Sequence, residues 1–427
     1  MSVLTRRNVV SWAFYDWANS SFATTVMAGF FPIFFKQYWS AGSEATVSTF
    51  RLGMGNGVAS AIIAVMAPLL GAIADRGGAR VKLLLFFTLL GVAMTAALYW
   101  VQKGDWQLAV VFYALAGVGF WGGTTFYDSL LPDVAAEREL DVVSSYGYAL
   151  GYLGGGLLFL INVVMTLNPR LFGLADAGEA VRWSFLSVAV WWAVFTLPLL
   201  LFVRERKPAT PLLPLAAMRA GWSELWQTIG HLRAYRALTL FLIAYWLYID
   251  GVNTIIKMAV DYGLSLGFDS KSLIVALLIT QFVAFPAALA FGWLGKRCGP
   301  RFGILLSIAV YLGVTVWGYF LETVAQFYTL AVIIGLVQGG IQSLSRSYFA
   351  RLVPPQKSGE FFGFFNMMGK FAAVLGPMLM GWVALVTGSS RLAILSIALL
   401  FAAGAILLAF VRQDSAPSSP GPGESSS

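Results

Sequence analysis

Several ionisable and amide side chains lie inside stretches that are otherwise apolar. Asp16 opens DWAN within SWAFYDWANSSFATT, Asp250 opens DGVN within LIAYWLYIDGVNTII, and Lys370 lies in a third apolar stretch. A charged side chain at the centre of a membrane helix costs about 3 kcal/mol by insertion scales, so each of these residues is a candidate for function. Two acids and a lysine could bind the ammonium and carboxylate groups of a zwitterion, and a desolvated acid could carry a proton.

Helical spacing places these groups on shared faces, because residues three or four apart lie on one side of a helix. The faces predicted to line one substrate site carry Asp16 and Asn19; Trp121 and Thr125; Asp250, Asn253 and Lys257; Gln338 and Gln342; and Asn366 and Lys370. Asp16 and Asp250 are the candidates for proton coupling. Two alternatives stay open: Asp250 could pair permanently with Lys257 or Lys370 as a structural ion pair, and Asp128, on the Trp121 face, could be an ordinary solvated acid.

The composition places these residues in a membrane protein. Of 427 residues, 59% are hydrophobic and only 11% are charged, against about 25% charged in soluble domains. Apolar runs of this length form membrane-spanning helices, which satisfy every backbone polar group in hydrocarbon. We predict an all-α membrane protein with twelve spans, at about 10–35, 52–74, 82–101, 107–128, 143–166, 183–203, 237–258, 272–294, 302–321, 325–346, 361–386 and 391–411.

Counting residues excludes several kinds of chemistry. The chain has one histidine, His231, in its longest polar loop, and one cysteine, Cys298. A Ser/His/Asp triad, an intramolecular disulfide and a histidine or thiolate metal cluster inside the bundle are therefore excluded. We expect no enzymatic activity, no cofactor and no bound metal.

The distribution of basic residues predicts the orientation, because cytoplasmic loops collect Lys and Arg. Nineteen basic residues, Arg346 among them, fall on the side of the N-terminus, and seven fall on the other side. Both termini are therefore expected in the cytoplasm, and the net charge of +8 needs no nucleic-acid partner. The expected partners are the lipid bilayer, a small solute and, for a coupled mechanism, a proton; we expect a monomer.

The predicted organisation is an N-terminal bundle at 1–203, a cytoplasmic linker at 204–236, a C-terminal bundle at 237–411 and a disordered tail rich in Ser, Pro and Gly at 412–427. Within the linker, apolar residues recur at helical spacing, which favours a helix lying in the membrane interface; these are Trp222, Leu225, Trp226, Ile229 and Leu232. The alternative interpretation of this segment is a docking helix for a regulatory protein.

The two bundles repeat one another. GAIADRGGAR at 71–80 and GWLGKRCGPR at 292–301 both fit GxxxxRxGxR, and DWAN matches DGVN near the start of each half. Duplicated halves are typical of transporters that rock around a central site. The residues predicted to gate such a site are Gly71, Asp75, Arg76, Arg80, Arg297 and Arg301. Lys296 replaces Asp75 in the second copy, so the two loops cannot make identical contacts.

GAIADRGGAR is similar to the loop signature of the major facilitator superfamily. SWAFYDWANSSFATT, SSYGYALGYLGGGLLF and LIAYWLYIDGVNTII resemble its UMF-type branch, which contains bacterial permeases and fungal autophagy-related vacuolar amino-acid effluxers. The resemblance covers all twelve spans. It implies two pseudo-symmetric six-helix halves, and a secondary active or facilitative transporter that moves small organic solutes by alternating access.

The solute that the resemblance implies is an amino acid, carried by an efflux-type protein in a bacterial inner membrane. A drug, sugar or lipid-like permease of the same fold is the alternative. A non-transporting receptor or a membrane-embedded enzyme is the rival from another class. The residues permit uniport as well as proton coupling.

Overall fold

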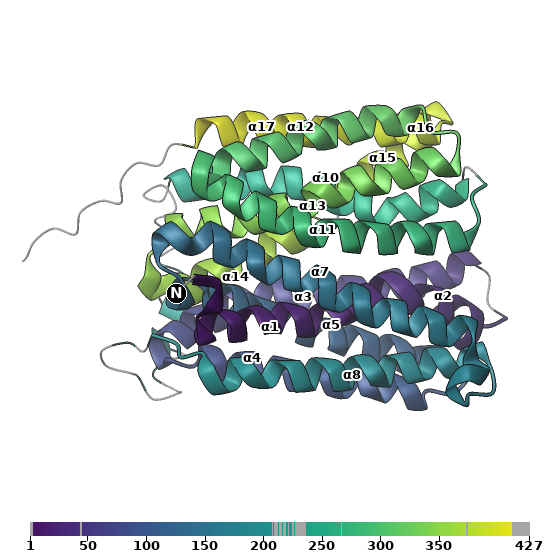
Figure 1. The fold of residues 1–427 in the computed structure, drawn as a ribbon, viewed down its shortest axis with the longest axis horizontal. Coiled ribbons are helices and arrows are strands. Elements are labelled where there is room, and N and C mark those ends of the chain that lie inside the picture. Colours follow the sequence, from purple (N-terminus) through teal and green to yellow (C-terminus); the bar gives the residue numbers. More distant parts are fainter. Residues whose placement is uncertain are drawn as a thin grey trace, which may run out of the picture.

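The computed structural model describes residues 3–42, 45–206, 236–265, 267–372 and 375–411, with 208, 212, 216, 219–220, 222–223 and 226 between the second and third of these ranges. Every regular element in this part of the chain is a helix. Long helices run side by side along one direction, and α1 begins at the same end of the bundle at which α17 ends (Figure 1). We call this the terminal end, and the opposite one the far end.

The helices of the N-terminal half are long and joined by short connections. They are α1 (Arg7–Ser21), η2 (Phe22–Phe30), α2 (Phe31–Phe34), η3 (Phe35–Trp39), α3 (Ala45–Gly77), α4 (Arg80–Ala97), α5 (Trp106–Ser129), α6 (Leu131–Val134), α7 (Leu140–Leu167) and α8 (Ala177–Phe202). Short 3₁₀ turns flank several of them: η1 (Val3–Thr5), η4 (Leu98–Trp100), η5 (Glu137–Glu139) and η6 (Pro169–Phe172).

The helices of the C-terminal half follow after the linker. They are α10 (Arg236–Ser265), α11 (Ser270–Cys298), α12 (Pro300–Tyr319), α13 (Val324–Leu352), α14 (Ser358–Phe371), α15 (Leu375–Thr387), α16 (Ser390–Ser396) and α17 (Ala398–Phe410), with the 3₁₀ turn η8 (Pro355–Lys357) before α14.

Eleven helices of the described chain are long and apolar enough to cross a membrane. The remaining predicted span corresponds to residues 7–39, which are helical throughout but alternate between α-helical and π-helical segments. The longest of these segments, α1, has only 15 residues. The eleven helices and the helical stretch at 7–39 together match the twelve spans expected from the sequence. The first span is three residues longer at its start and four residues longer at its end than predicted.

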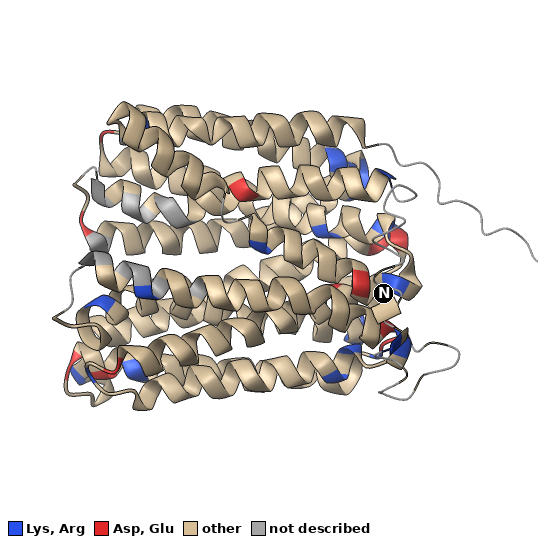
Figure 2. Ribbon diagram, turned by 180° about the vertical axis from the view of Figure 1, so that it is seen from behind, with Lys and Arg blue, Asp and Glu red and all other residues tan. Residues whose placement is uncertain are grey.

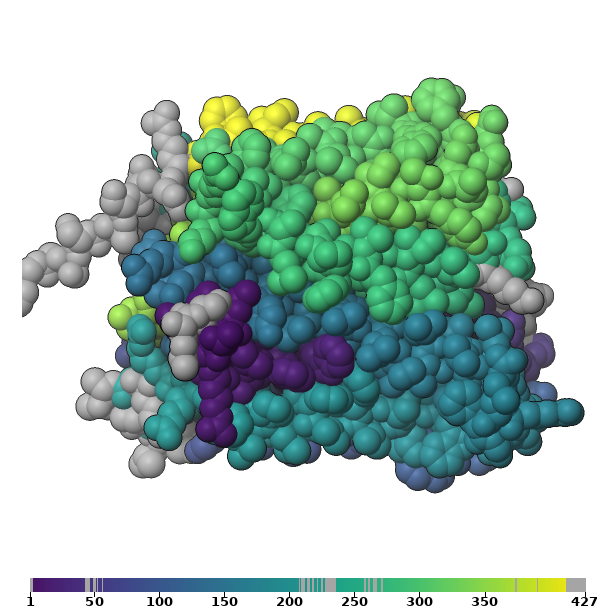
Figure 3. Space-filling model, viewed as in Figure 1, coloured from purple at the N-terminus to yellow at the C-terminus, as the bar shows by residue number. Residues whose placement is uncertain are grey.

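The two halves meet along a broad interface. In Figure 1 the N-terminal half lies below and the C-terminal half above, and the space-filling view shows them in contact along the middle of this face (Figure 3). The interface is formed mainly by α3 against α14 and by α7 against α11 and α13. Charged residues gather at the ends of the helices, and a few lie along their middle (Figure 2).

The glycine-rich fifth span forms one uninterrupted helix, α7. Its glycines allow α7 to approach α1 closely: a Cβ at Gly155 would lie 2.9 Å from the backbone oxygen of Ser20, and one at Gly147 would lie 2.8 Å from Asp16 Oδ2. The small residues are thus needed for packing, which explains why a helix forms despite the low helix propensity of glycine.

The eleventh span, predicted at 361–386, is described as α14 and α15, and residues 373–374 between them lie outside the described residues. The backbone N–H of Leu375 donates to Asp250 of α10. The expected interfacial helix of the linker lies mostly outside the described residues, although the rings of Trp222 and Trp226 lie 5.9 Å apart. The expected disordered tail at 412–427 also lies outside them.

Candidate functional site

Arg346 on α13 is a buried cation that joins the two halves. Its side chain is 1% exposed, and Nη1 lies 2.9 Å from Asp128 Oδ1 on α5 and 3.4 Å from Asp16 Oδ2 on α1. The same guanidinium donates through Nε to Ser144 Oγ at 2.9 Å and through Nη2 to the Ser144 carbonyl at 2.8 Å on α7. One arginine of the C-terminal half therefore binds three helices of the N-terminal half.

Aromatic rings enclose this ion-pair cluster. The Arg346 guanidinium lies 4.3 Å from the centroid of the Tyr148 ring and 4.9 Å from that of Trp12. Tyr127 lies at the same site and donates its hydroxyl hydrogen to Asp16 Oδ2 at 2.7 Å. Such contacts combine charge–charge and cation–π attraction in a place with little water.

Two expectations from the sequence are corrected at this cluster. The sequence predicts Arg346 on the cytoplasmic side of its span, but α13 continues to Leu352 and buries Arg346. Asp128 is not a solvated acid: it is 3% exposed, and its Oδ2 accepts from Asn366 Nδ2 on α14 at 3.1 Å. The sequence feature that could have indicated this cluster is an arginine inside an otherwise apolar helix, within a segment that also contains Ser343, Ser345 and Ser347.

Asp250 makes contacts of a different kind, within the C-terminal half. Its carboxylate accepts from the backbone N–H groups of Leu375 at 3.0 Å and Gly376 at 2.9 Å, and from Thr254 Oγ1 at 3.2 Å. These N–H groups belong to the first two described residues of α15. A Cβ at Gly376 would lie 1.9 Å from Thr254 Oγ1, so only glycine fits there.

The other predicted binding residues lie along the helices that meet between the halves. Tyr152 donates to Gln342 Oε1 across the interface at 2.9 Å, and the Lys370 amino group lies over the Trp121 ring, also from the other half. Asn253 Nδ2 reaches the Ala372 carbonyl at 3.5 Å. Within the N-terminal half, Asn19 Nδ2 lies 3.4 Å from Thr124 Oγ1, and Thr125 is buried. Gln338 is 9% exposed, and the Lys257 side chain lies outside the described set.

The first copy of the repeated loop contacts the opposite half. Asp75 accepts from the backbone N–H of Gly359 at 3.0 Å and of Glu360 at 2.9 Å, so it caps α14. Gly71 lies against the same turn, since a Cβ there would be 2.1 Å from the Gly359 carbonyl oxygen. Both residues thus help to hold α3 on α14 at the terminal end.

Arg80 completes these contacts from a buried position. It pairs with Asp133 at 2.9 Å and donates through Nη1 to Ser358 Oγ of the other half at 2.7 Å. Its backbone N–H donates to Glu205 Oε2 at 2.6 Å. Burial raises the pKa of the Glu205 carboxyl, while the hydrogen bond from the Arg80 backbone opposes this shift. Arg76 is exposed, and its carbonyl accepts from the Leu212 backbone.

The second copy of the loop packs on the opposite half through its glycines, since a Cβ at Gly292 would lie 2.7 Å from Ser145 Cβ. The contacts described for its arginines lie within its own half. Arg301 donates to the carbonyl oxygens of Val411, at 3.2 Å, and Ala409. The guanidinium of Arg297 lies 5.2 Å from the centroid of the Trp293 ring. The backbone nonetheless repeats, because Gly78 and Gly299 both have positive φ after the helix end, at 59° and 83°. The two loops share a conformation and differ in their partners.

A further cross-half contact was missed from the sequence. Asp141, in the first turn of α7, accepts from Ser347 Oγ at 2.6 Å and pairs with Arg351, both on α13. Nearby, Ser145 Oγ and Ser343 Oγ lie 2.9 Å apart. Farther from the terminal end, Gln281 Nε2 of the C-terminal half donates to Thr24 Oγ1 of the N-terminal half at 3.1 Å. The ion pairs between the halves described above all lie toward the terminal end.

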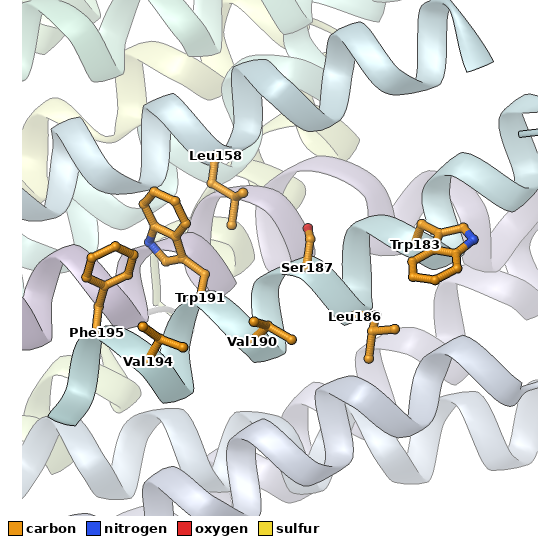
Figure 4. Close-up of a pocket in the computed structure, with 8 residues that line it drawn as sticks. All are labelled: Leu158, Trp183, Leu186, Ser187, Val190, Trp191, Val194 and Phe195. Atoms are coloured by element: carbon orange, nitrogen blue, oxygen red, sulfur yellow. The ribbon is translucent and has the colours of Figure 1, made fainter. Parts of the chain in front are cut away.

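An apolar groove lies away from these contacts, on the N-terminal half. Seven residues of α8 and Leu158 of α7 line it, with Ser187 as the polar member (Figure 4). Ser187 Oγ is already bonded to Asn162 Oδ1 at 3.1 Å. None of the predicted binding or gating residues lines this groove.

Comparison with known proteins identifies the family. The family described as "Vacuole effluxer Atg22 like" matches residues 40–419. The chain belongs to this family. It is 40% identical over 409 residues to the uncharacterised MFS-type transporter YxiO of Bacillus subtilis (strain 168), covering 95% of this chain and 94% of YxiO. It is 29% identical over 287 residues to the autophagy-related protein 22-1 of Penicillium rubens, covering 60% of this chain and 47% of the fungal protein.

Solved structures agree on the fold. The human organic anion transporter MFSD10 superposes with a TM-score of 0.72 at 16% identity, covering 94% of this chain and 99% of MFSD10. The major facilitator transporter FucP in its outward conformation gives 0.69 at 14% identity, covering 97% and 100%. This member of the Atg22-like family is therefore an integral membrane transporter of the major facilitator superfamily, with the two six-helix halves expected from its sequence.

Proposed function

We propose that this Atg22-like transporter carries amino acids by alternating access, and that the state described above is closed at its terminal end. The observation that carries the proposal is the set of charged contacts joining the halves at that end. Arg346 binds Asp16 and Asp128, Asp75 caps α14, and Arg351 pairs with Asp141. A path from a central site toward the terminal end can form only if these contacts break.

The proposed substrate class has two supports. The family description names a vacuole effluxer, and the resemblance noted from the sequence is to amino-acid effluxers. Side chains of both signs lie along the interface between the halves, with Asp16 and Lys370 among them, and could bind the two charged ends of an amino acid. The predicted binding and gating residues belong to this proposal, with Asp250 supporting α15 instead of binding solute directly.

The proposed orientation follows from the basic residues. The terminal end carries most of the Lys and Arg residues, which favours the cytoplasmic side of a bacterial inner membrane. In this orientation both chain termini lie in the cytoplasm, and the state closed at the terminal end faces outward. The proposed transporter works as a monomer, because each chain has both halves around its own interface.

A reversible crosslink tests alternating access. In a Cys298→Ser background, Ser145→Cys with Ser343→Cys places two thiols where the serine oxygens lie 2.9 Å apart. Oxidation should join the halves at the terminal end and stop amino-acid exchange in proteoliposomes, and reduction should restore it. The matched control is the Ser343→Cys single variant with the same oxidant. Undiminished exchange by the oxidised double variant would contradict alternating access.

A substrate panel tests the solute class. Purified transporter in proteoliposomes is offered labelled amino acids, sugars and cationic drugs, and exchange above that of protein-free vesicles is measured. We expect exchange of amino acids. Exchange restricted to sugars, drugs or lipids would replace the substrate assignment and leave the transport mechanism intact.

A further inference from the structure

We propose that Asp16 and Asp128, which share Arg346, form a binding site for one proton. The site holds the proton while the terminal end is closed and releases it when that end opens. This inference rests on the proposed alternating access and names the coupling ion. It also assigns a role to Asp128 and Arg346, which the sequence did not place in the substrate site.

The charges around Asp16 can be counted from the structure. The titratable and charged groups that face it are Tyr15 on its own helix, Tyr127 and Asp128 on α5, Tyr148 and Tyr152 on α7, and Arg346 on α13. The helix α8 also packs against α1, and the contacts described there are made by uncharged aromatic side chains that pack on Trp17. The groups that act on Asp128 are Arg346, Asp16 and the neutral Asn366 of α14. Among the groups named for both carboxylates, Arg346 is the cation, and Asp16 and Asp128 are the acids. Two ionised acids would leave one uncompensated negative charge in a buried site, which one proton removes.

The geometry assigns the proton to Asp16. Both oxygens of Asp128 accept hydrogen bonds, one from Arg346 at 2.9 Å and one from Asn366 at 3.1 Å, so this acid is the ionised partner. Asp16 lies farther from Arg346, at 3.4 Å, and accepts through Oδ2 from Tyr127, which leaves Oδ1 for the proton.

The site couples proton binding to the opening of the terminal end because its residues lie on opposite halves. Opening the terminal end separates α13 from α1 and α5, so water reaches Asp16 and the cost of its negative charge falls. A proton bound in the closed state is therefore released to the terminal side. Low pH therefore favours the closed state, and high pH favours the open state.

The chain contains a natural control for this arrangement. Asp141 and Arg351 also join α7 to α13 at the terminal end, but there one acid meets one base. A one-to-one pair is neutral without a proton. Breaking it should weaken the closed state, while the response of the gate to pH stays as it was.

The experiment measures the distance across the terminal end by double electron–electron resonance. One spin label is attached to the native Cys298, which is exposed and is the only cysteine of the chain. The other is attached to Glu137→Cys, an exposed position before α7. The ratio of open to closed molecules is recorded without substrate from about pH 5.5 to about pH 8.5. For one coupled proton it should change about tenfold per pH unit across the titration.

Variants separate the proton site from the gate as a whole. Asp16→Asn, which mimics the protonated acid, should stay closed with less than about a twofold change over the same range. Asp128→Asn, which leaves one acid for Arg346, should also lose the slope. Asp141→Asn should keep the tenfold slope, with its midpoint shifted toward acid. A flat wild-type response, or a full slope in both Asp16→Asn and Asp128→Asn, would overturn the proposal.

This readout is independent of the solute. If the distance responds to pH as expected but no amino acid is exchanged, the proton site stands and the substrate assignment fails. If amino acids are exchanged while the distance ignores pH, the proton site fails and the transport proposal stands.

Discussion

Asp16 and Asp250 occupy matching positions in the two halves, each at the head of a DxxN pattern, and they use their carboxylates differently. Asp16 binds side chains of other helices: Tyr127 of its own half and Arg346 of the opposite half. Asp250 binds backbone N–H groups of α15 within its own half. One acid lies at a contact between the two halves, and the other binds the backbone of a helix of its own half.

The difference shows that a duplicated pattern conserves position in the fold more than chemistry. The same asymmetry appears in the repeated loops, where Asp75 caps a helix of the opposite half while the corresponding residue is the exposed Lys296. Contacts between the halves are therefore unequal on the two sides of the interface. The α3–α14 side has a helix cap from Asp75, and the α7–α13 side has ion pairs on Arg346 and Arg351.

The comparison of the two acids predicts unequal effects on stability. Asp250→Ala should lower the free energy of unfolding by about 2 to 6 kcal/mol, because the backbone N–H groups of Leu375 and Gly376 lose their acceptor at about 1 to 3 kcal/mol each. Asp16→Ala should cost only about 1 kcal/mol, since Asp128 still pairs with Arg346. Thermal unfolding in detergent, followed by tryptophan fluorescence, measures both.

Asp250→Asn is the matched control, since one amide oxygen can still accept from one N–H group. Its loss of stability should lie between those of the wild type and Asp250→Ala. Equal stability of Asp16→Ala and Asp250→Ala would show that Asp250 has no special part in holding α15.

Much of the fold was predictable because hydrophobic runs of about 20 residues have one structural solution in a membrane. The contact between Asp250 and α15 was not, because it joins residues that are distant in the sequence. An apolar run shows where a helix can form but not where a side chain from another helix binds its backbone.

The sequence predicted which helix faces carry the residues of the site, but not which side chains contact one another. Spacing identified Asp16, Asn366 and Lys370 as inward-facing residues. It could not show that Asp128 is shared between Arg346 and Asn366, because that contact depends on how α5, α13 and α14 pack. Arg346 was missed because an arginine near a helix end is usually a topology signal.

The arginines of the two repeated loops offer the next test. Arg80→Gln should shift the open-to-closed equilibrium toward the open state by about 2 kcal/mol, because the charged hydrogen bond from Arg80 to Ser358 of the opposite half is lost. Arg301→Gln should leave this equilibrium unchanged, since Arg301 binds carbonyl oxygens of its own half. The label pair at 137 and 298 reports both, and matching shifts in the two variants would contradict the assigned asymmetry.

Substitution of Asp75, in the first of the two repeated loops, gives the smallest expected effect on the open-to-closed equilibrium. Asp75→Asn keeps the size of the side chain but has one acceptor oxygen for the two N–H groups of α14, so the closed state should weaken by about 1 kcal/mol, or about fivefold in the open-to-closed ratio. Lys296→Gln, at the same place in the second loop, should leave the ratio unchanged because its side chain is exposed. An unchanged ratio in Asp75→Asn would mean that the close packing of Gly71 on Gly359 is enough to hold α3 on α14. A shift in Lys296→Gln would mean that the second loop also contributes to the gate, through contacts formed only in the open state.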